Sequence, residues 1–383
     1  MEEAEFKGAF GKIVETQDSE HGKYKAFIPN KLPPKVEYTS QVVLALSKAD
    51  STLSKLSGAG LLLPNPDLLI IPYLKKEALS SSRIEGTRIS LSDYFLSEAK
   101  GIKKNDAEAT EVLNYVEAIN YGLEKIKEEQ ITVELIKEMH KILLSNVRGN
   151  ELLPGNFRPV QNWIGPPNTK IQEATFVPPP KEEVENLVKE LIEYLNFYDE
   201  MPLLIRCALM HYQFETIHPF CDGNGRIGRT LITLYLCKKN KISKPLLYAS
   251  DYFEKHRREY YDLLLNTNKS GKFEEWIKFF LEAIKVQSED ALDRTIKIQN
   301  LREEYRKKII KEKQANNLIK VMDNLFFNPY TTINQISAQL KVTYPTAKKI
   351  VDQFIKLGIL KETKQKEREK LFVGHEILNI ITV

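Results

Sequence analysis

Residues 214–229 read FETIHPFCDGNGRIGR, and this stretch says more about fold and function than any other part of the chain. It closes an apolar segment at His218 and opens a new helix behind Gly223-Asn224-Gly225. Glycine adopts positive φ without strain, and the first N–H groups of a helix carry partial positive charge. The stretch therefore predicts two helices joined by a short loop whose backbone binds a phosphate-sized anion.

The charged residues of this stretch suit a nucleotide phosphate. Asp222 supplies a hard oxygen ligand for Mg²⁺ that is otherwise held by phosphates and water. Arg226 and Arg229 are three residues apart on the helix, so both reach one anion. His218, with an ordinary pKa near 6.5, can accept a proton from a hydroxyl at neutral pH. Each residue alone also fits a plain glycine-rich corner with a buried His-Pro pair, but the set favours attack of a hydroxyl on a nucleotide phosphate.

Length and composition bound the class of protein. A chain of 383 residues with 28% charged residues suits two or three soluble domains, and a net charge of +4 restricts any nucleic-acid contact to a local patch. Three cysteines without metal-like spacing indicate a reducing compartment. We find no signal sequence or membrane-length apolar run and expect a cytoplasmic protein. The cysteines are Cys207, Cys221 and Cys237.

The rest of the chain divides by pattern. Residues 1–40, broken by three prolines, predict an irregular arm, and apolar spacing predicts helices from residue 40 onward. A Pro- and Gly-rich segment contains two short β-prone runs, from which we expect a hairpin. Trp163 and Phe176 are candidates for its packing anchors, and an ordinary core role is the alternative for both. The expected helices are 105–128, 131–144 and the region from 181 to about 286, and the expected hairpin pairs 160–164 with 174–177.

The C-terminal segment has the order of a winged helix-turn-helix domain. Residues 344–357 are its expected recognition helix, with Lys348 and Lys349 near the start. The expected wing is basic but interleaved with glutamates, so both DNA contact and protein contact remain open. The wing carries Lys361, Lys364, Lys366, Arg368 and Lys370 together with Glu362, Glu367 and Glu369.

The stretch HPFCDGNGRIGR resembles the Fic family signature, HPFxDGNGRxxR, and fills every fixed position. The resemblance extends over residues 40 to 286. WIGPPNTKIQEATFVPPP is similar to the family's target-docking hairpin, and HRREYYDLLLNTNKSGKFEEW to the helix that closes the nucleotide pocket. The resemblance implies a mainly α fold, in which a Fic-type helical core with a small β-hairpin flap precedes the winged-helix domain.

What the resemblance implies is AMPylation, the transfer of AMP from ATP to a Ser, Thr or Tyr hydroxyl of a protein, with Mg²⁺. His218 would be the general base, Asp222 the metal ligand and Arg229 the clamp on the γ-phosphate. For Tyr260 and Tyr261, which the resemblance places beside the adenine, packing in the core is the alternative. The remaining implied nucleotide contacts are Gly223, Asn224, Gly225, Arg226, Tyr260, Tyr261 and Asn268.

A second segment, SSRIEG at residues 81–86, resembles the family's inhibitory motif, [S/T]xxxE[G/N]. The resemblance implies that Glu85 pairs with Arg229 and keeps the γ-phosphate from seating, with Ser81 and Gly86 completing the motif. The alternative is an ordinary helix end with a glycine cap.

We therefore expect an autoinhibited protein adenylyltransferase that modifies a protein target, or itself. The alternatives are a nucleotide-sensing DNA-binding regulator, and removal of AMP or another nucleotidyl transfer in the same pocket. The sequence does not decide whether the protein forms a homodimer. The expected domains are an N-terminal helical region with the inhibitory motif (1–110), a catalytic core (111–286), a charged helical connector (287–315) and the winged helix (316–383).

Overall fold

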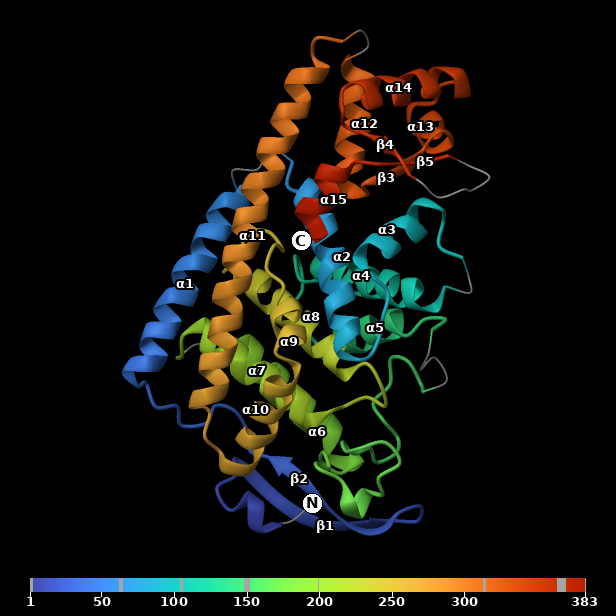
Figure 1. Ribbon diagram of the computed structural model, residues 1–383. Helices are drawn as coiled ribbons and strands as arrows, with labels where there is room; N and C mark the ends of the chain where they lie inside the picture. The colour runs from blue at the N-terminus through green and yellow to red at the C-terminus, as the bar shows by residue number, and fades with distance from the viewer. Residues whose placement is uncertain are drawn as a thin grey trace.

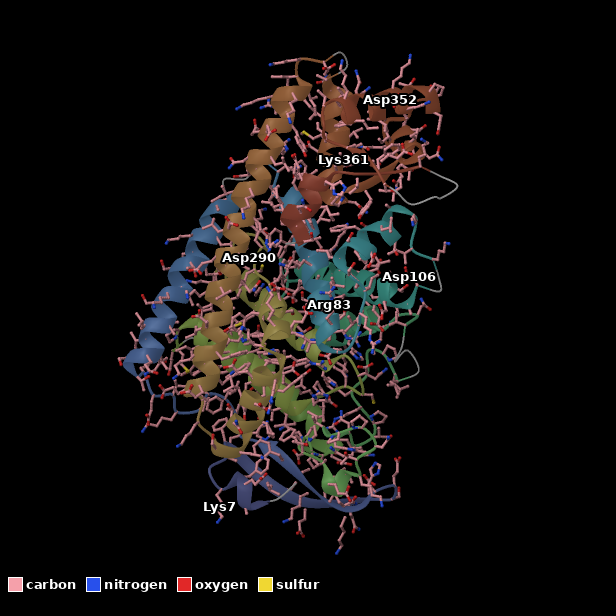
Figure 2. The ribbon with its side chains drawn as sticks, in the orientation of Figure 1. Lys7, Arg83, Asp106, Asp290, Asp352 and Lys361 are labelled. Carbon is pink, nitrogen blue, oxygen red and sulfur yellow. The ribbon has the colours of Figure 1, made fainter. Side chains whose placement is uncertain are left out.

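The computed structural model describes residues 3–61, 65–103, 106–147, 152–198, 200–312, 315–363 and 370–382. The molecule is elongated and mainly helical, and the long helix α11 (Glu274–Ile309) runs beside α1 (Ser40–Leu61) along one side (Figure 1). The N-terminal strands lie at one end and the helices of residues 315–356 at the other, while the last helix packs back toward the middle of the molecule. Figure 2 shows Lys7 near the first end, Asp352 and Lys361 at the second, and Arg83 between them.

The N-terminal third contains η1 (Glu3–Phe6), β1 (Gly11–Asp18), β2 (Gly22–Pro29), α1, α2 (Asp67–Ile84) and α3 (Leu91–Ala99). The central part contains α4 (Ala107–Lys125), α5 (Val133–Leu143), η2 (Ile171–Glu173), α6 (Lys181–Phe197), α7 (Leu203–Ile217), α8 (Asn224–Lys238), α9 (Ser250–Lys255) and α10 (Arg257–Ser270). After α11 follow α12 (Ala315–Phe327), β3 (Tyr330–Thr332), α13 (Ile333–Leu340), α14 (Tyr344–Lys356), β4 (Lys361–Glu362), β5 (Leu371–Val373) and α15 (His375–Thr382).

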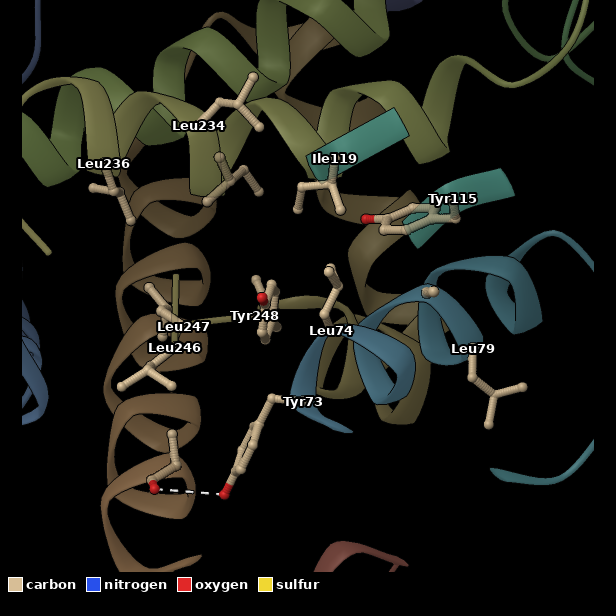
Figure 3. Close-up of a cluster of buried hydrophobic side chains, with 14 of the residues drawn as sticks. Tyr73, Leu74, Leu79, Tyr115, Ile119, Leu234, Leu236, Leu246, Leu247 and Tyr248 are labelled. Atoms are coloured by element: carbon tan, nitrogen blue, oxygen red, sulfur yellow. Dashed lines mark hydrogen bonds between the residues drawn. The ribbon is translucent and has the colours of Figure 1, made fainter. Parts of the chain in front are cut away.

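The core is built around α7 and α8, which are buried on nearly every side. α7 is mostly apolar, whereas α8 also carries the polar side chains of Asn224, Arg226 and Arg229 into the interior. Figure 3 shows Leu234 of α8 and Ile119 of α4 in the same cluster as Leu74 of α2. The same view shows Tyr73 of α2 donating a hydrogen bond to the carbonyl of Ala291 in α11, at 3.5 Å. The helix that ends in the inhibitory motif is thus packed into the core.

Helices with clear local signals lie where the sequence predicted them. The prediction over 105–128 corresponds to α4, whose N-cap Asp106 accepts from the N–H of Ala109 at 3.2 Å; residue 105 lies outside the described residues. The prediction over 131–144 corresponds to α5, which Thr132 caps by accepting from the N–H of Leu135 at 3.0 Å. The expected connector is not a separate element, because α11 runs unbroken from Glu274 through most of it.

The irregular arm predicted over residues 1–40 is wrong for its first part, where β1 and β2 form an antiparallel hairpin. A tight turn connects the strands. The Asp18 carboxylate accepts from the N–H groups of Glu20 and His21 at 2.9 and 2.6 Å, and Gly22 takes a φ of 70°. Asp and Gly at these positions are ordinary turn residues, but the strands are too polar to be recognised by alternation. The N-terminal region is therefore not all helical.

The hairpin predicted for the Pro- and Gly-rich segment is present only in part. Ile164 and Phe176 form a single antiparallel bridge, with N···O distances of 2.8 and 3.0 Å, and η2 lies between them. The prolines around both runs lack the N–H groups that a longer ladder needs. We call residues 160–177 the flap.

The C-terminal segment has the predicted element order. An antiparallel sheet in the order β3-β5-β4 packs beside α13 and α14, and a capping box between Thr332 and Gln335 starts α13. The expected recognition helix corresponds to α14, which begins at Tyr344. Residues 364–369, which include Lys364, Lys366 and Arg368 of the expected wing, lie outside the described residues.

Candidate active site

A pocket of about 440 Å³ lies where α7, α8 and α10 meet the flap and the end of α2. This volume is in the range of small-molecule sites in proteins. The polar lining residues are Glu85, Thr175, Glu215, Thr216, His218, Arg229, Tyr261, Asp262 and Asn268, with Gly225 of the predicted anion nest.

His218 stands at the end of α7 in the left-handed conformation, with a φ of 49°. Its Nδ1 lies 3.3 Å from the carbonyl oxygen of Glu215, which can only accept, so Nδ1 carries the proton and Nε2 keeps its lone pair. Burial and the nearby Arg158 guanidinium lower the pKa of His218 to about 4. The imidazole is therefore neutral at pH 7 and able to accept a proton.

Arg158, which sequence reasoning missed, fixes the backbone around His218. Its Nε donates to the His218 carbonyl at 3.0 Å, and its backbone N–H donates to the carbonyl of Pro219 at 2.9 Å. Because Arg158 directly precedes the flap, it also ties the base of the flap to the catalytic loop.

Two polar side chains shape the loop between α7 and α8. Asn224 closes it by accepting from the N–H of Phe220 and donating to the same residue's carbonyl, both at 2.8 Å. His140 of α5 accepts at Nδ1 from Gly155, so its Nε2 donates to the carbonyl of Asp222 at 2.9 Å. The His140 ring also stacks on Phe220 with centroids 3.8 Å apart. His140 was not predicted, since a histidine on the apolar face of a helix is not distinctive in sequence.

Asp222 and Arg226 form a local pair at the start of α8. The carboxylate accepts from the N–H of Gly223 at 2.6 Å and from the Arg226 guanidinium at 3.3 Å. In the described ranges no cluster of three or more His, Cys, Asp or Glu side chains suits a metal ion. One carboxylate beside a glycine nest fits Mg²⁺ held mainly by substrate phosphates and water.

Arg229 joins the inhibitory motif to the anion nest. Its Nε donates to Ser81 Oγ at 2.9 Å, and one terminal nitrogen donates to the Ser81 carbonyl at 3.0 Å and to Glu85 Oε1 at 2.8 Å. Burial opposes the charge of this guanidinium, but the Glu85 carboxylate, together with smaller contributions from Tyr260 and Glu215, raises the pKa of Arg229. A Cβ placed on Gly225 would lie 2.4 Å from Glu85 Oε1, so the carboxylate lies directly against the nest. Gly86 turns the chain away with a φ of 107°.

Glu215, near the end of α7, is a further acidic group in the pocket, and the sequence analysis did not single it out. Its Oε1 is buried and has no hydrogen-bond partner among the described residues. Burial is the main reason that its pKa rises to about 8, and the nearby Glu85 carboxylate adds to the effect. The Arg229 guanidinium opposes this rise without cancelling it, so the Glu215 carboxyl is largely protonated at pH 7.

The residues expected on the adenine side divide between pocket and core. Tyr261 and Asn268 line the pocket. The Asn268 oxygen accepts from the hydroxyls of Tyr212 and Thr216, at 2.6 and 3.1 Å, which fixes the orientation of its amide. Tyr260 does not line the pocket: it is fully buried, and its hydroxyl lies 2.8 Å from Nε2 of His211.

Sequence comparisons identify the family. The model described as "Fic/DOC family N-terminal" matches residues 43–124, and the "Fic/DOC family" model matches residues 130–236. A third, "Protein adenylyltransferase SoFic-like, C-terminal domain", matches residues 301–377. Together the matches cover well over half of the chain, and the chain belongs to the Fic/DOC family.

Two similar curated proteins have names that state an activity. Protein adenylyltransferase fic-1 of Caenorhabditis elegans is 29% identical over 182 residues, covering 44% of this chain and 33% of that protein. Protein adenylyltransferase Fic of Nematostella vectensis is 30% identical over 206 residues, covering 52% of this chain and 44% of that protein. The matched region is thus less than half the length of either relative.

Solved structures share the fold. A Fic family protein from Desulfovibrio desulfuricans G20 aligns with a TM-score of 0.57 at 18% identity, covering 89% of this chain and 98% of that one. A fragment of Fic-1 from C. elegans aligns with a TM-score of 0.52 at 23% identity, covering 68% of this chain and 74% of that one. In the part of the chain that the structure describes, no helix combines the length and apolar character needed to cross a membrane.

Proposed function

We propose that this protein is an adenylyltransferase that moves AMP from ATP to a Ser, Thr or Tyr hydroxyl of a protein. The observation that carries the proposal is the juxtaposition of His218, the Gly225 nest and Arg229 in one pocket. A neutral base, an anion-binding backbone and a buried guanidinium are the groups that such a transfer requires. The names of the relatives support the same activity.

In this mechanism, Nε2 of His218 takes the proton of the target hydroxyl. The hydroxyl oxygen forms a bond to the α-phosphorus, the bond from that phosphorus to the bridging oxygen breaks, and pyrophosphate leaves. The N–H groups at the start of α8 and the two arginines hold the charge that develops on the phosphates. Asp222 is the residue that would hold Mg²⁺, which neutralises phosphate charge when bound.

We further propose that the chain is autoinhibited by Glu85. Its carboxylate contacts the guanidinium that would clamp the γ-phosphate, and it lies against the glycine nest. A phosphate oxygen and this carboxylate would compete for the same donors. The buried Ser81 contacts hold Arg229 in place, so ATP would have to displace Glu85 to seat productively.

A second activity in the same pocket is removal of AMP from a modified protein. Glu85 favours it, because this carboxylate lines the pocket together with His218 and could position a water molecule. The third alternative is a nucleotide-sensing regulator that binds DNA through exposed Lys348 and Lys349 on α14.

The test compares the wild type, Glu85→Gly and Glu85→Gly/His218→Ala with α-labelled ATP, Mg²⁺ and a cell lysate. We expect protein-bound label only with Glu85→Gly, and ATP affinity raised roughly 10- to 100-fold, the equivalent of one charged hydrogen bond. Release of AMP from labelled protein by the wild type alone would support the reverse activity. ATP binding without label in all three proteins would favour the sensor. Equal ATP affinity in wild type and Glu85→Gly would reject the inhibitory role.

A further inference from the structure

The hairpin of β1 and β2 packs against the flap, although it precedes residue 43, where the first family match begins. In Figure 1 the blue strands lie directly beside the green flap segment at the N-terminal end of the molecule. A hydrogen bond joins the two, from the N–H of Phe27 in β2 to the carbonyl of Val177 at 2.9 Å.

The backbone contacts place the flap inside a ribbon of four segments. Phe176 turns its N–H and carbonyl toward Ile164, and the next residue, Val177, turns its carbonyl to the opposite side, toward β2. This alternation is that of an extended strand paired on both sides. The order across the ribbon is therefore Ile164, then the 176–177 segment, then β2 and β1. Within the described ranges, Ile164 has no ladder partner on its outer side, and it lines the pocket.

Side chains hold the hairpin to the flap. Phe27 is fully buried between Phe6 and Phe176, with ring centroids at 5.6 and 5.8 Å. Gln172 of η2 donates from Nε2 to the carbonyl of His21 at 2.7 Å, and the His21 ring packs edge-on against Trp163 at 5.1 Å. The back of the flap is thus covered by apolar and aromatic contacts.

The N-terminal segment is also anchored to the helices of the active site. Glu5 forms an ion pair with Lys269 of α10 at 2.7 Å, and the Phe10 ring packs on Phe273 at 5.5 Å. Gln213 of α7 donates to the carbonyl of Asn30 at 3.0 Å. The hairpin therefore links the flap to the two helices that carry His218 and Asn268.

We infer that the β1–β2 hairpin is a positioning element for target modification, an inference that rests on the proposed transferase function. It fixes the flap as a preformed edge, and an extended segment of the target protein adds to this edge at Ile164. Strand addition of this kind depends on main-chain donors and acceptors held in an extended line. Phe27 and Gln172 hold the flap in place and do not contact ATP. Through the flap they orient the acceptor hydroxyl of the target relative to His218.

The experiment places Gln172→Ala and Phe27→Ala in the Glu85→Gly protein, with Phe27→Leu as the conservative rescue. Gln17→Ala is the matched control, since Gln17 is an exposed glutamine of β1 for which no bond to the flap exists among the described residues. The measurements are hydrogen exchange at residues 160–177, ATP affinity, thermal stability, and label from α-labelled ATP on the protein itself and on an added lysate.

We expect faster exchange in the flap but not at residues 218–229, and transfer at least about tenfold lower, because small misplacements of reacting groups are costly. ATP affinity should change less than about twofold, because neither side chain reaches the phosphates. Gln17→Ala and Phe27→Leu should keep both flap protection and transfer. Unchanged exchange in the flap would overturn the inference, and so would a loss of transfer that follows ATP affinity or unfolding. If Glu85→Gly itself transfers no label, the proposed function fails, while exchange still decides whether the hairpin fixes the flap.

Discussion

The pocket has two walls that are held in place by different means. The phosphate wall is the loop and helix start at residues 218–229, and the flap wall is the flap at residues 160–177. On the phosphate wall, Asn224 bonds a residue four positions away, and Asp222 bonds Gly223 and Arg226. On the flap wall, Gln172 bonds a residue 151 positions earlier in the chain. The first wall carries most of its geometry in a dozen consecutive residues, whereas the second depends on an N-terminal segment outside the family matches.

The two arginines of α8 show the same contrast inside the phosphate wall. Arg226 is paired with Asp222 of its own loop, and Arg229 with Glu85, which is 144 residues away. The local pair of Arg226 and Asp222 forms as soon as the loop between α7 and α8 folds. A distant pair forms only if α2 is in place, so under the proposed autoinhibition it is the contact whose loss would relieve the inhibition.

The largest effect should come from the phosphate wall. In the Glu85→Gly background, we expect His218→Ala to lower transfer at least about 100-fold, because the acceptor hydroxyl loses its general base. Binding of ATP should persist, since the nest and both arginines remain. The measurement is label transfer alongside ATP titration. Retention of most transfer would mean that a group other than His218 takes the proton.

The next effect concerns the long-range arginine. Arg229→Ala in the Glu85→Gly background should weaken ATP binding roughly 10- to 100-fold, the equivalent of about 1.5–3 kcal/mol for a charged hydrogen bond. The matched comparison is ADP, which lacks the γ-phosphate and should bind the two proteins with similar affinity. Calorimetric titration of both nucleotides measures the difference. An equal loss for ADP and ATP would place Arg229 away from the γ-phosphate.

A smaller effect is expected on stability, at the point where α5 supports the phosphate wall. His140→Ala removes the partner of the Gly155 N–H and of the Asp222 carbonyl, and unsatisfied buried groups of this kind cost about 1–3 kcal/mol. Urea unfolding of the variant and of the wild type gives the free energy difference. Lys141→Ala, an exposed neighbour on the same helix, is the control and should change little. Equal stabilities for His140→Ala and wild type would mean that the loop does not need this support.

These contacts explain which parts of the molecule could be predicted from sequence. The caps of α4 and α5 and the loop between α7 and α8 rest on near neighbours, and their patterns are visible in the chain. His140 acts on a carbonyl 82 residues away, so nothing close to it in sequence reveals its role. The β1–β2 hairpin was missed because its strands mix polar and apolar residues, and its apolar partners belong to the flap. Glu215 is unusual only through burial, which the pattern of a helix end does not specify.

The smallest expected change is in the pH dependence of transfer, which we expect to be nearly flat. Only the neutral imidazole of His218 accepts a proton, and its pKa is lowered to about 4, mainly by burial. With an ordinary pKa of about 6.5, the neutral fraction would fall from about 90% at pH 7.5 to about 10% at pH 5.5; with a pKa of about 4 it stays above about 95%. Removing Glu85 takes away a nearby negative charge that raises this pKa, so Glu85→Gly should keep it low.

We therefore expect kcat/KM of Glu85→Gly to change less than about twofold between pH 5.5 and 7.5 at saturating Mg²⁺, since kcat/KM reports the titration of groups in the free enzyme. Unchanged circular dichroism over this range is the control for unfolding. A fall of about tenfold by pH 5.5 would show that water reaches the imidazole as it does in a model peptide. In that case the His218 imidazole would be open to water, and burial would not be what keeps it neutral.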